Sequence, residues 1–390
     1  MTNRMAIEGS HAVSEAVKQA NVDVVAAYPI TPQTHIVERL SEMVADGELD
    51  AEFVPVESEH SAMSVCVGAA AAGARAFTCT SSQGLALMSE IVYIASSMRL
   101  PMLMVLANRT LSAPLSIWND HSDAMMVRDT GWIQIFVNNA QEAYDHVFIG
   151  YRTGEDHRVL LPVMLHMDGF FLTHAIEPLE PVEQELIDRY LPPYKPLYRL
   201  HPDQPLTMGA FAMPDQYAEI KKAQDEAIKA AYGPLLEAWR EWGELTGRRY
   251  QPVEGMYLED AEVALLTMGS YGEVASMAVE EMRSKGKAVG LLKLRLWRPF
   301  PFAELREALK GVKTVAVIDR SVSCGGPGGP VASEVRSALY SEGDSPRVVD
   351  FIVGISGRDV TPEDYERMVE LTPRLLEEGP EGYMFYGVKE

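Results

Sequence analysis

Cysteine is scarce in this sequence of 390 residues, which contains only Cys66, Cys79 and Cys324. No two of them form a C-x-x-C pair, so the chain by itself does not have the ligand spacing of a structural zinc site or an iron–sulfur cluster. A sparse, odd count fits a reducing compartment, and the first residues, MTNRMAIEGSHAVSEAV, contain no apolar core of a signal peptide. Together these absences predict a cytoplasmic protein.

Basic residues are also few, with 34 Lys and Arg against 56 Asp and Glu, so that the net charge is -22. Nucleic-acid binding depends on a basic protein face, and anionic lipid surfaces attract basic segments for the same reason. The most apolar run, residues 62–73, is roughly a dozen residues long, whereas a bilayer requires about 20. The sequence therefore predicts neither nucleic acid nor membrane as a partner.

Two common catalytic motifs are missing as well. No G-x-S-x-G nucleophile elbow is present, and the glycine-rich run at 325–329 lacks the lysine of a phosphate-binding P-loop. This run is more consistent with a tight turn before a helix. The run of Asn and Asp at 119–123 does not have the spacing of a calcium loop, so no metal site is predicted there.

The hydrophobic pattern of the first part of the chain is typical of a parallel α/β sheet, because short apolar runs alternate with helical periodicity. Bulky runs with little alternation indicate strands that helices cover on both faces. We expect strands at 22–27, 52–56, 76–79, 102–106, 133–137 and 159–165, and helices at 11–20, 33–45, 60–72, 83–98 and 140–153. Residues 1–170 would form this doubly wound domain.

Prolines at short intervals between 168 and 213 predict an extended connector without regular structure. Two amphipathic helices would follow it, at 215–232 and 235–245, completing a linking region at 171–255. Their predicted buried face consists of Tyr217, Ile220, Ala227, Leu235, Trp239 and Trp242. A second α/β domain would occupy 256–390, with a glycine-opened helix at 325–341 and an acidic, solvated helix at 361–378.

Polar side chains follow the predicted strands of the first domain, at the edge where open α/β sheets bind ligands. Thr31 lies between two prolines, where it either presents its hydroxyl to a ligand or caps the next helix. Glu59 opens a predicted helix, either as an acid–base group or as a carboxylate favoured by the helix dipole. Ser82 stands at a helix start that fits a polar cofactor group or a plain cap.

Arg109 directly follows a buried apolar strand, which is costly for a cation unless it is paired. Two interpretations are open. In the first, Arg109 is a fork that binds a carboxylate ligand. In the second, it forms an internal salt bridge, with Asp120 or Asp123 as its partner.

Seven segments in one order carry a family resemblance: YPITPQT, VPVESEHSAM, TCTSSQGLALM, NRTLSAPLSIWNDHSD, GSYGEV, LRLWRPFPF and VIDRSVSCGGPGG. The sequence resembles the alpha subunit of the 2-oxoacid:ferredoxin oxidoreductases, the pyruvate synthase family, over nearly its whole length. The resemblance implies a pyrimidine-type thiamine diphosphate-binding domain followed by a transketolase C-terminal-like domain. It also implies oxidative decarboxylation of a 2-oxoacid to acyl-CoA and CO2.

The resemblance also assigns roles to residues. Glu59 would be catalytic, through a hydrogen bond to the aminopyrimidine of thiamine diphosphate. Thr31 and Arg109 would bind the carbonyl and carboxylate of the 2-oxoacid. The remaining assigned residues are Tyr28, Pro29 and Ser82 for the cofactor, and Asn119, Asp120 and His121 in a loop that would close over the substrate.

A further absence fits the resemblance, because the chain has no G-D-G motif to hold Mg2+ and diphosphate. The family places that half of the site on a beta subunit and its iron–sulfur clusters on other subunits, and gamma- and delta-type subunits are expected as further partners. Coenzyme A would be the cosubstrate and ferredoxin, or another acceptor such as NAD, would receive the electrons. The chain would therefore be catalytically incomplete without its partners.

The identity of the 2-oxoacid is less constrained. Thr31 in place of a second arginine argues against a substrate with two carboxylate-like ends, and Leu115, Ile117 and Trp118 make the nearby loop apolar. Pyruvate is the first expectation; branched-chain and aryl 2-oxoacids such as phenylglyoxylate are the alternatives. A self-contained transketolase-like transferase is disfavoured by the missing G-D-G, and a non-catalytic scaffold by the joint presence of Glu59, Thr31 and Arg109.

Overall fold

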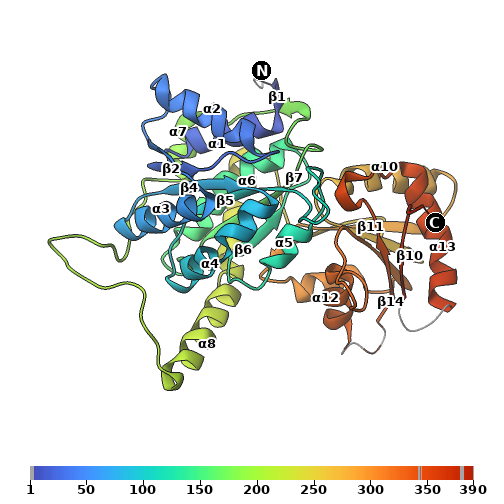
Figure 1. Ribbon diagram of the computed structural model, residues 1–390. Helices are drawn as coiled ribbons and strands as arrows, with labels where there is room; N and C mark the ends of the chain where they lie inside the picture. Colours follow the sequence, from blue (N-terminus) through green and yellow to red (C-terminus); the bar gives the residue numbers. More distant parts are fainter. Residues whose placement is uncertain (1–3, 341–342, 344, 378–381, 390) are drawn as a thin grey trace.

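The computed structural model describes residues 4–340, 343, 345–377 and 382–389, which form two α/β domains side by side (Figure 1). The first sheet has seven strands in the order β12-β6-β7-β5-β4-β2-β3, and the second has six in the order β15-β14-β13-β10-β11-β9. No helix within these described ranges is both long and apolar enough to cross a bilayer.

The first sheet contains the six predicted strands, with small differences at their ends. They are β2 (Val24–Ala27), β3 (Glu52–Pro55), β4 (Ala76–Thr80), β5 (Leu103–Asn108), β6 (Ile133–Phe136) and β7 (Val163–Asp168), and all of their mutual pairings are parallel. A seventh strand, β12 (Leu296–Arg298), comes from the second half of the chain and pairs antiparallel with β6. The sequence pattern did not indicate this last pairing.

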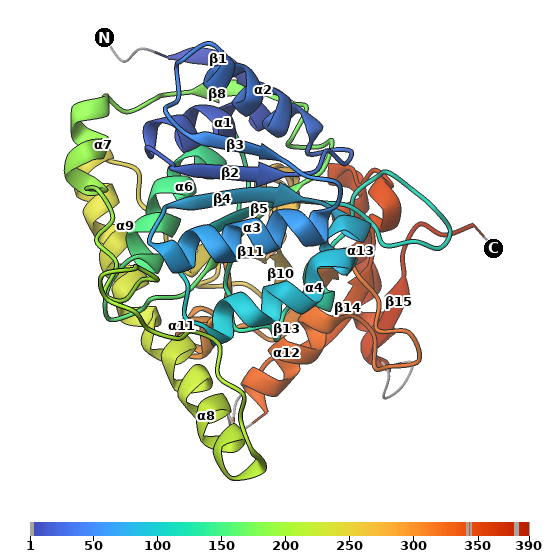
Figure 2. The same cartoon turned by 60° about the vertical axis from the view of Figure 1, so that its left-hand side comes forward.

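Helices cover both faces of the first sheet, which is why its central strands are apolar throughout (Figure 2). They are α1 (Gly9–Gln19), α2 (Thr34–Ala45), α3 (Glu59–Ala72), α4 (Ser82–Ser97), the short α5 (Ser122–Met126) and α6 (Ala140–Gly154). The start of α3 is fixed by Ser58, whose hydroxyl accepts the Ser61 N–H, and its end by Gly73 in the left-handed region at φ 96°. Glu59 is thereby placed at the first position of α3.

The linking region is more regular than its prolines predicted. β8 (Ile176–Leu179) pairs with the N-terminal β1 (Met5–Glu8), and α7 (Gln184–Tyr190) follows, so the expectation of an unstructured connector is wrong in these two places. β8 gains its order from a partner far away in sequence, which no local pattern reveals.

The two helices after the connector are α8 (Pro214–Ala230) and α9 (Tyr232–Thr246). Trp239 and Trp242 are buried as predicted, but Tyr217 and Ile220 are 55% and 41% exposed, so their predicted burial is wrong. The cause is visible in Figure 1, where the first part of α8 extends beyond the body of the protein.

The second domain is built on β9 (Val253–Met256), β10 (Val263–Thr267), β11 (Val289–Leu294), β13 (Thr314–Asp319), β14 (Arg347–Ile352) and β15 (Tyr383–Phe385). Its helices are α10 (Tyr271–Ser284), α11 (Phe302–Ala308), α12 (Pro330–Leu339) and α13 (Pro362–Glu377). Two expectations are corrected here. The glycine run at 325–329 precedes α12 instead of opening it, and α13 buries Tyr365 and Met368 against the domain, so it is not a purely solvated helix. Part of the predicted helix at 325–341 and residue 378 lie outside the described residues.

Candidate active site

Four predicted site residues come together at one edge of the first sheet, at the carboxyl ends of neighbouring strands. Thr31 follows β2, Glu59 follows β3, Ser82 follows β4 and Arg109 follows β5. The strand order β5-β4-β2-β3 makes these ends adjacent, as expected for ligand sites of open α/β sheets.

The Glu59 carboxylate lies over the first turn of α4. Only 7% of the residue is exposed, and a Cβ atom added to Gly84 would lie 2.7 Å from its Oε1 and 2.4 Å from Thr80 Oγ1. Within the described residues, this carboxylate makes no hydrogen bond or ion pair, and the buried hydroxyls of Thr80 and Ser81 have no partner either. Buried polar groups are normally hydrogen-bonded, so this spot has free capacity for a polar ligand.

Arg109 is only 6% exposed and contacts three oxygen atoms. Its guanidinium donates to the carbonyls of Thr31 (2.9 Å) and Ser116 (3.0 Å) and to Gln83 Oε1 (3.0 Å). No carboxylate of the described chain lies within ion-pair distance of it, so the internal salt bridge to Asp120 or Asp123 is absent.

Burial lowers the pKa of Arg109, which shows that the surroundings penalise its charge. Arginine nevertheless remains protonated in proteins. A buried, unpaired guanidinium attracts an anionic ligand, and the fork geometry suits a carboxylate.

Ser82 is buried, and its backbone is in the left-handed region at φ 43°. Its hydroxyl lies 2.6 Å from both the Thr110 carbonyl and Gln83 Oε1, and its N–H donates to Asp123 Oδ2 at 3.0 Å. The side chain is therefore engaged within the chain, and it connects the end of β4 to the end of β5.

Tyr28, Pro29 and Thr31 form an exposed loop on the other side of the site. The loop is anchored to the protein interior, because the buried Gln33 side chain donates to the Tyr28 carbonyl at 2.7 Å. The side of the site that these residues form is open to solvent in the single chain.

Asn119, Asp120 and His121 lie elsewhere, at the junction of the two domains, and all three are buried. Arg320 donates to Asn119 Oδ1, and the Asn119 amide donates to the Gly169 carbonyl at 2.9 Å. Asp120 Oδ1 accepts from Ser122. In the single chain these side chains thus have partners within the chain, and closure of the loop over substrate remains a prediction.

His121 and Arg320 meet at Asp168, which is the centre of the domain junction. Asp168 Oδ1 accepts from Arg320 (2.6 Å) and contacts His121 Nε2 (3.0 Å), while Ser270 donates to Oδ2. Burial alone would raise the pKa of Asp168, but the Arg320 charge and the His121 contact hold this pKa well below its usual range. The second domain therefore holds the end of the loop that follows Arg109.

Sequence reasoning missed three residues of the site, namely Thr80, Gly84 and Asp123. Gly84 and Thr80 belong to the segment TCTSSQGLALM, where a glycine one turn into a helix was a signal of close approach. Asp123 was weighed only as an ion-pair partner or metal ligand, whereas it accepts backbone N–H groups. The described residues contain no group of three or more His, Cys, Asp or Glu side chains that could hold a metal ion.

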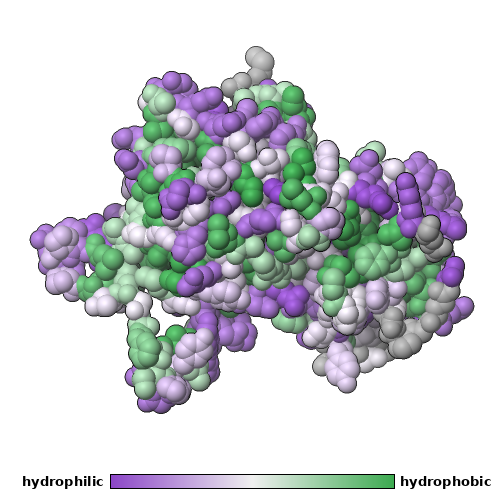
Figure 3. Space-filling model, viewed as in Figure 1, coloured by the Kyte–Doolittle hydropathy of each residue, from purple (hydrophilic) through white to green (hydrophobic). Residues whose placement is uncertain are grey.

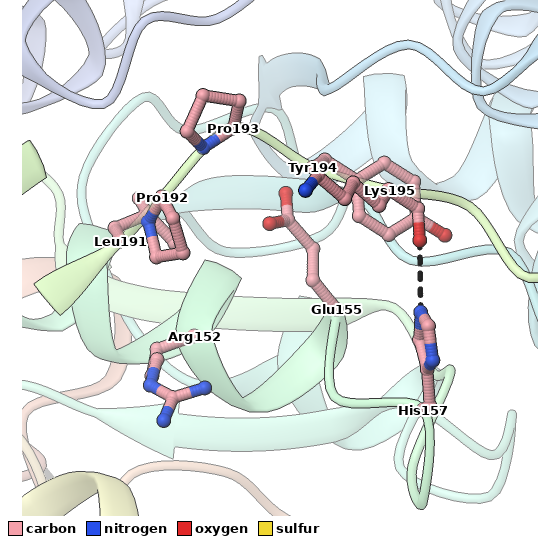
Figure 4. A pocket seen from close by; sticks show the side chains of 8 residues that line it. All are labelled: Arg152, Glu155, His157, Leu191, Pro192, Pro193, Tyr194 and Lys195. Atoms are coloured by element: carbon pink, nitrogen blue, oxygen red, sulfur yellow. Dashed lines mark hydrogen bonds between the residues drawn. The ribbon is translucent and has the colours of Figure 1, made fainter. Parts of the chain in front are cut away.

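A pocket of about 340 Å³ lies beside the end of α6 (Figure 4). Its lining includes Glu155, which pairs with Arg75 at 2.6 Å, and His157, which contacts the Lys195 carbonyl at 2.8 Å. The end of α6 leads into the amino end of β7, so this pocket lies at the opposite end of the sheet from Glu59 and Arg109. It is not part of the candidate site.

Comparison with known proteins identifies the family. A family profile described as "Pyruvate flavodoxin/ferredoxin oxidoreductase, thiamine diP-bdg" matches residues 15–235, and one described as "Pyruvate:ferredoxin oxidoreductase core domain II" matches 261–365. The chain belongs to this oxidoreductase family. The predicted family, the predicted fold class and the prediction of a 2-oxoacid oxidoreductase subunit are confirmed.

Two relatives and one solved structure illustrate the similarity. Pyruvate synthase subunit PorA of Methanothermobacter thermautotrophicus is 48% identical over 385 residues, which cover 98% of each chain. Ketoisovalerate oxidoreductase subunit VorA of Pyrococcus abyssi is 43% identical over 375 residues, which cover 96% of this chain and 94% of VorA. A 2-oxoglutarate:ferredoxin oxidoreductase from Magnetococcus marinus, with 2-oxoglutarate, coenzyme A and succinyl-CoA bound, matches with a TM-score of 0.72 at 19% identity. That match covers 95% of this chain and 65% of the longer chain and shows the shared fold.

Proposed function

We propose that this chain is the alpha subunit of a cytoplasmic 2-oxoacid:acceptor oxidoreductase and that its substrate is pyruvate. One observation carries the proposal. The same sheet edge holds a buried Glu59 carboxylate without a hydrogen-bond partner and a buried Arg109 guanidinium without an ion-pair partner. The names of the PorA relatives support pyruvate as the substrate.

The residues present fit the aminopyrimidine end of thiamine diphosphate. Glu59 is a buried carboxylate without a protein partner, next to the unpartnered hydroxyl of Thr80 and the space left by Gly84. Glu59 would hold the ring by a hydrogen bond, Tyr28 and Pro29 would line it, and the turn at Ser82 would border it. When bound, thiamine diphosphate supplies the electron sink that decarboxylation of a 2-oxoacid requires.

Substrate orientation falls to Arg109 and Thr31. The guanidinium already holds the Thr31 carbonyl, so the two residues form one unit. Its remaining donors, the guanidinium N–H groups not bonded to the chain and the Thr31 hydroxyl, suit the carboxylate and the carbonyl of a 2-oxoacid. A carboxylate would supply the charge partner that Arg109 lacks. The substrate would thus be fixed by its two oxygen-bearing carbons, leaving the side chain to set specificity.

The Mg2+ and diphosphate half of the site would come from a beta subunit. The chain has no G-D-G motif, and apolar side chains near the site are exposed, among them Leu87 and Ile94 on α4 and Leu115 (74% exposed) and Trp118 after β5. Figure 3 shows hydrophobic residues distributed over the face that carries α3 and α4. A beta subunit that covers these exposed side chains would also exclude water from the site.

The rest of the reaction would use further components. Coenzyme A would accept the acyl group, and iron–sulfur clusters on partner subunits would carry electrons to ferredoxin or another acceptor. Gamma- and delta-type subunits would complete the complex. A branched-chain 2-oxoacid is the second candidate substrate, favoured by the VorA relative and by the apolar side chains of Leu115 and Ile117 near Arg109.

The test is anaerobic purification of the native complex through a tag on this chain, followed by coenzyme A-dependent dye reduction with a panel of 2-oxoacids. We expect pyruvate to give the highest kcat/KM and Glu59→Gln to abolish turnover while the complex stays assembled. Glu57→Gln is the matched control, because Glu57 is exposed and, among the described residues, its side chain bonds only Ser61. A complex that reduces no dye with any 2-oxoacid would refute the proposal, and a higher kcat/KM for 2-oxoisovalerate would replace pyruvate by the second candidate.

A further inference from the structure

Asp123 is a fully buried acid beneath the candidate site and lies outside the set of residues to which a role has been assigned. It is the second residue of α5, and its carboxylate is at the ends of β4 and β5. Among the described residues no Lys, Arg or His side chain forms an ion pair with it. The chain keeps a charge-capable group in its interior here without the usual cationic partner, which calls for a physical reason.

Four donors surround this carboxylate. Oδ1 accepts from the Asn108 amide (2.9 Å) and from the Ala124 N–H (2.7 Å), and Oδ2 accepts from the N–H groups of Arg109 and Ser82, both at 3.0 Å. Burial raises the pKa of Asp123 to about 7, whereas the hydrogen bonds from the four donors favour the ionised carboxylate. Such a carboxylate is stabilised by hydrogen bonds instead of by an opposite charge.

The two donors to Oδ2 follow different strands of the sheet. Ser82 begins α4 after β4 and leads to Gly84, against which the Glu59 carboxylate packs, whereas Arg109 follows β5. One oxygen atom therefore fixes the backbone on the Glu59 side of the site relative to the backbone that carries the guanidinium.

The backbone at Ser82 needs such an anchor. Its φ of 43° lies in the left-handed region, which costs a non-glycine residue free energy and persists only when surrounding contacts hold it. The bond from the Ser82 N–H to Asp123 Oδ2 is one of these contacts, and the Ser82 hydroxyl on the Thr110 carbonyl is another.

We propose that Asp123 is a positioning residue that sets the distance between the carboxylate-binding Arg109 and the Glu59 side of the site. The inference rests on the proposed function, since it assumes that Arg109 binds the carboxylate of the 2-oxoacid. Asp123 touches neither substrate nor cofactor; it acts through the two backbone N–H groups.

The test is steady-state kinetics of the native complex with pyruvate and coenzyme A. Asp123→Asn replaces an acceptor oxygen by an NH2 group that faces two N–H donors, so we expect KM for pyruvate to rise about tenfold or more. The dissociation constant of thiamine diphosphate, measured by reconstitution of the apo-complex, should change less than about twofold, because Glu59 is retained.

A double-mutant cycle with Arg109→Lys separates positioning from general damage. If Asp123 acts through Arg109, Asp123→Asn adds less than about a twofold rise in KM when Lys already stands at 109. The matched control is Asp145→Asn, which also removes a buried carboxylate. Asp145 lies on α6 and is the partner of Arg248 and Tyr250. That control should lower the thermal midpoint and leave KM unchanged.

The outcomes distinguish a failure of this inference from a failure of the proposed function. If the wild-type complex turns over pyruvate and Asp123→Asn leaves KM unchanged, this inference alone is overturned. It is also overturned if the effects of the two substitutions on KM multiply in the double-mutant cycle. A wild-type complex without 2-oxoacid activity overturns the proposed function instead. If Asp123→Asn does not assemble, Asn108→Ser removes a single donor from the carboxylate, and a rise in KM of about threefold supports the inference while no change overturns it.

Discussion

Replacing Gly84 by alanine tests whether the space beside Glu59 is part of the site. A methyl group at this position would lie 2.4 Å from Thr80 Oγ1 and 2.7 Å and 2.8 Å from Oε1 and Cγ of Glu59. Ordinary contacts of a Cβ atom are above about 3.4 Å, so the Glu59 side chain must move by roughly 1 Å. A displacement of this size at a reacting group lowers turnover by about 100-fold, so we expect kcat to fall by that factor.

Stability should change much less than turnover. Alanine is favoured over glycine in a helix by about 1 kcal/mol, but the added methyl group also overlaps the buried, β-branched Thr80 side chain, and such overpacking costs about 1–3 kcal/mol. The thermal midpoint of Gly84→Ala should therefore lie at or slightly below that of the wild type. The assay is coenzyme A-dependent dye reduction by the native complex, with thermal unfolding of the same samples.

Gly233→Ala is the matched control, since Gly233 is also helical but has no atom within 4 Å of an added Cβ. It should leave kcat unchanged. A Gly84→Ala complex with wild-type kcat would show that the position of the Glu59 carboxylate is not critical, and the argument from the unfilled space would be refuted.

Arg109→Lys removes the fork that holds the Thr31 carbonyl and Gln83, so KM for pyruvate should rise about tenfold in steady-state kinetics, and an unchanged KM would contradict carboxylate binding at Arg109. Burial raises the pKa of Asp350 from 3.8 to about 6. Between these two pH values the folded state keeps a proton that the unfolded chain has already released. The free energy of unfolding therefore falls as pH rises through that window. The neighbouring Asp319 also has a raised pKa, partly because of Asp350. Asp350→Asn keeps the oxygen that accepts the Gly329 N–H at 2.6 Å and should reduce this fall, measured as chemical unfolding at about pH 4 and pH 8; equal pH dependence in both proteins would contradict it. Leu115→Ser should weaken assembly with the beta subunit in co-purification without lowering the thermal midpoint of the isolated chain, because its side chain is 74% exposed; full assembly would argue against an interface there.

The sequence allowed the central sheet to be predicted because its strands carry their own signal. β4, β5 and β7 are short apolar runs that helices cover on both faces, and their limits lie within a few residues of the expected ones. β8 and β12 escaped prediction because their order comes from partners distant in the chain. Tyr217 and Ile220 have helical spacing, but periodicity identifies an apolar face and does not reveal whether another element covers it.

The candidate site likewise contains residues whose position the sequence indicated and residues whose contribution it did not. Thr31, Glu59, Ser82 and Arg109 were accessible to prediction because strand ends of an open sheet converge. Gly84 contributes by having no side chain, and its only mark in the sequence is a glycine near the start of a predicted helix. Asp123 contributes by accepting N–H groups, which leaves no mark in residue type or spacing.

The pairing of β12 with β6 has a consequence for how the chain folds during its synthesis. Until Arg298 has left the ribosome, β6 remains an open edge whose four residues, Ile133–Phe136, are fully buried in the finished protein. At ordinary translation rates this interval lasts about 10–30 s, long enough for an unpaired apolar edge to recruit another chain. A fragment that ends before β12 would keep that edge permanently, so the first domain is expected to aggregate when it is produced without the second.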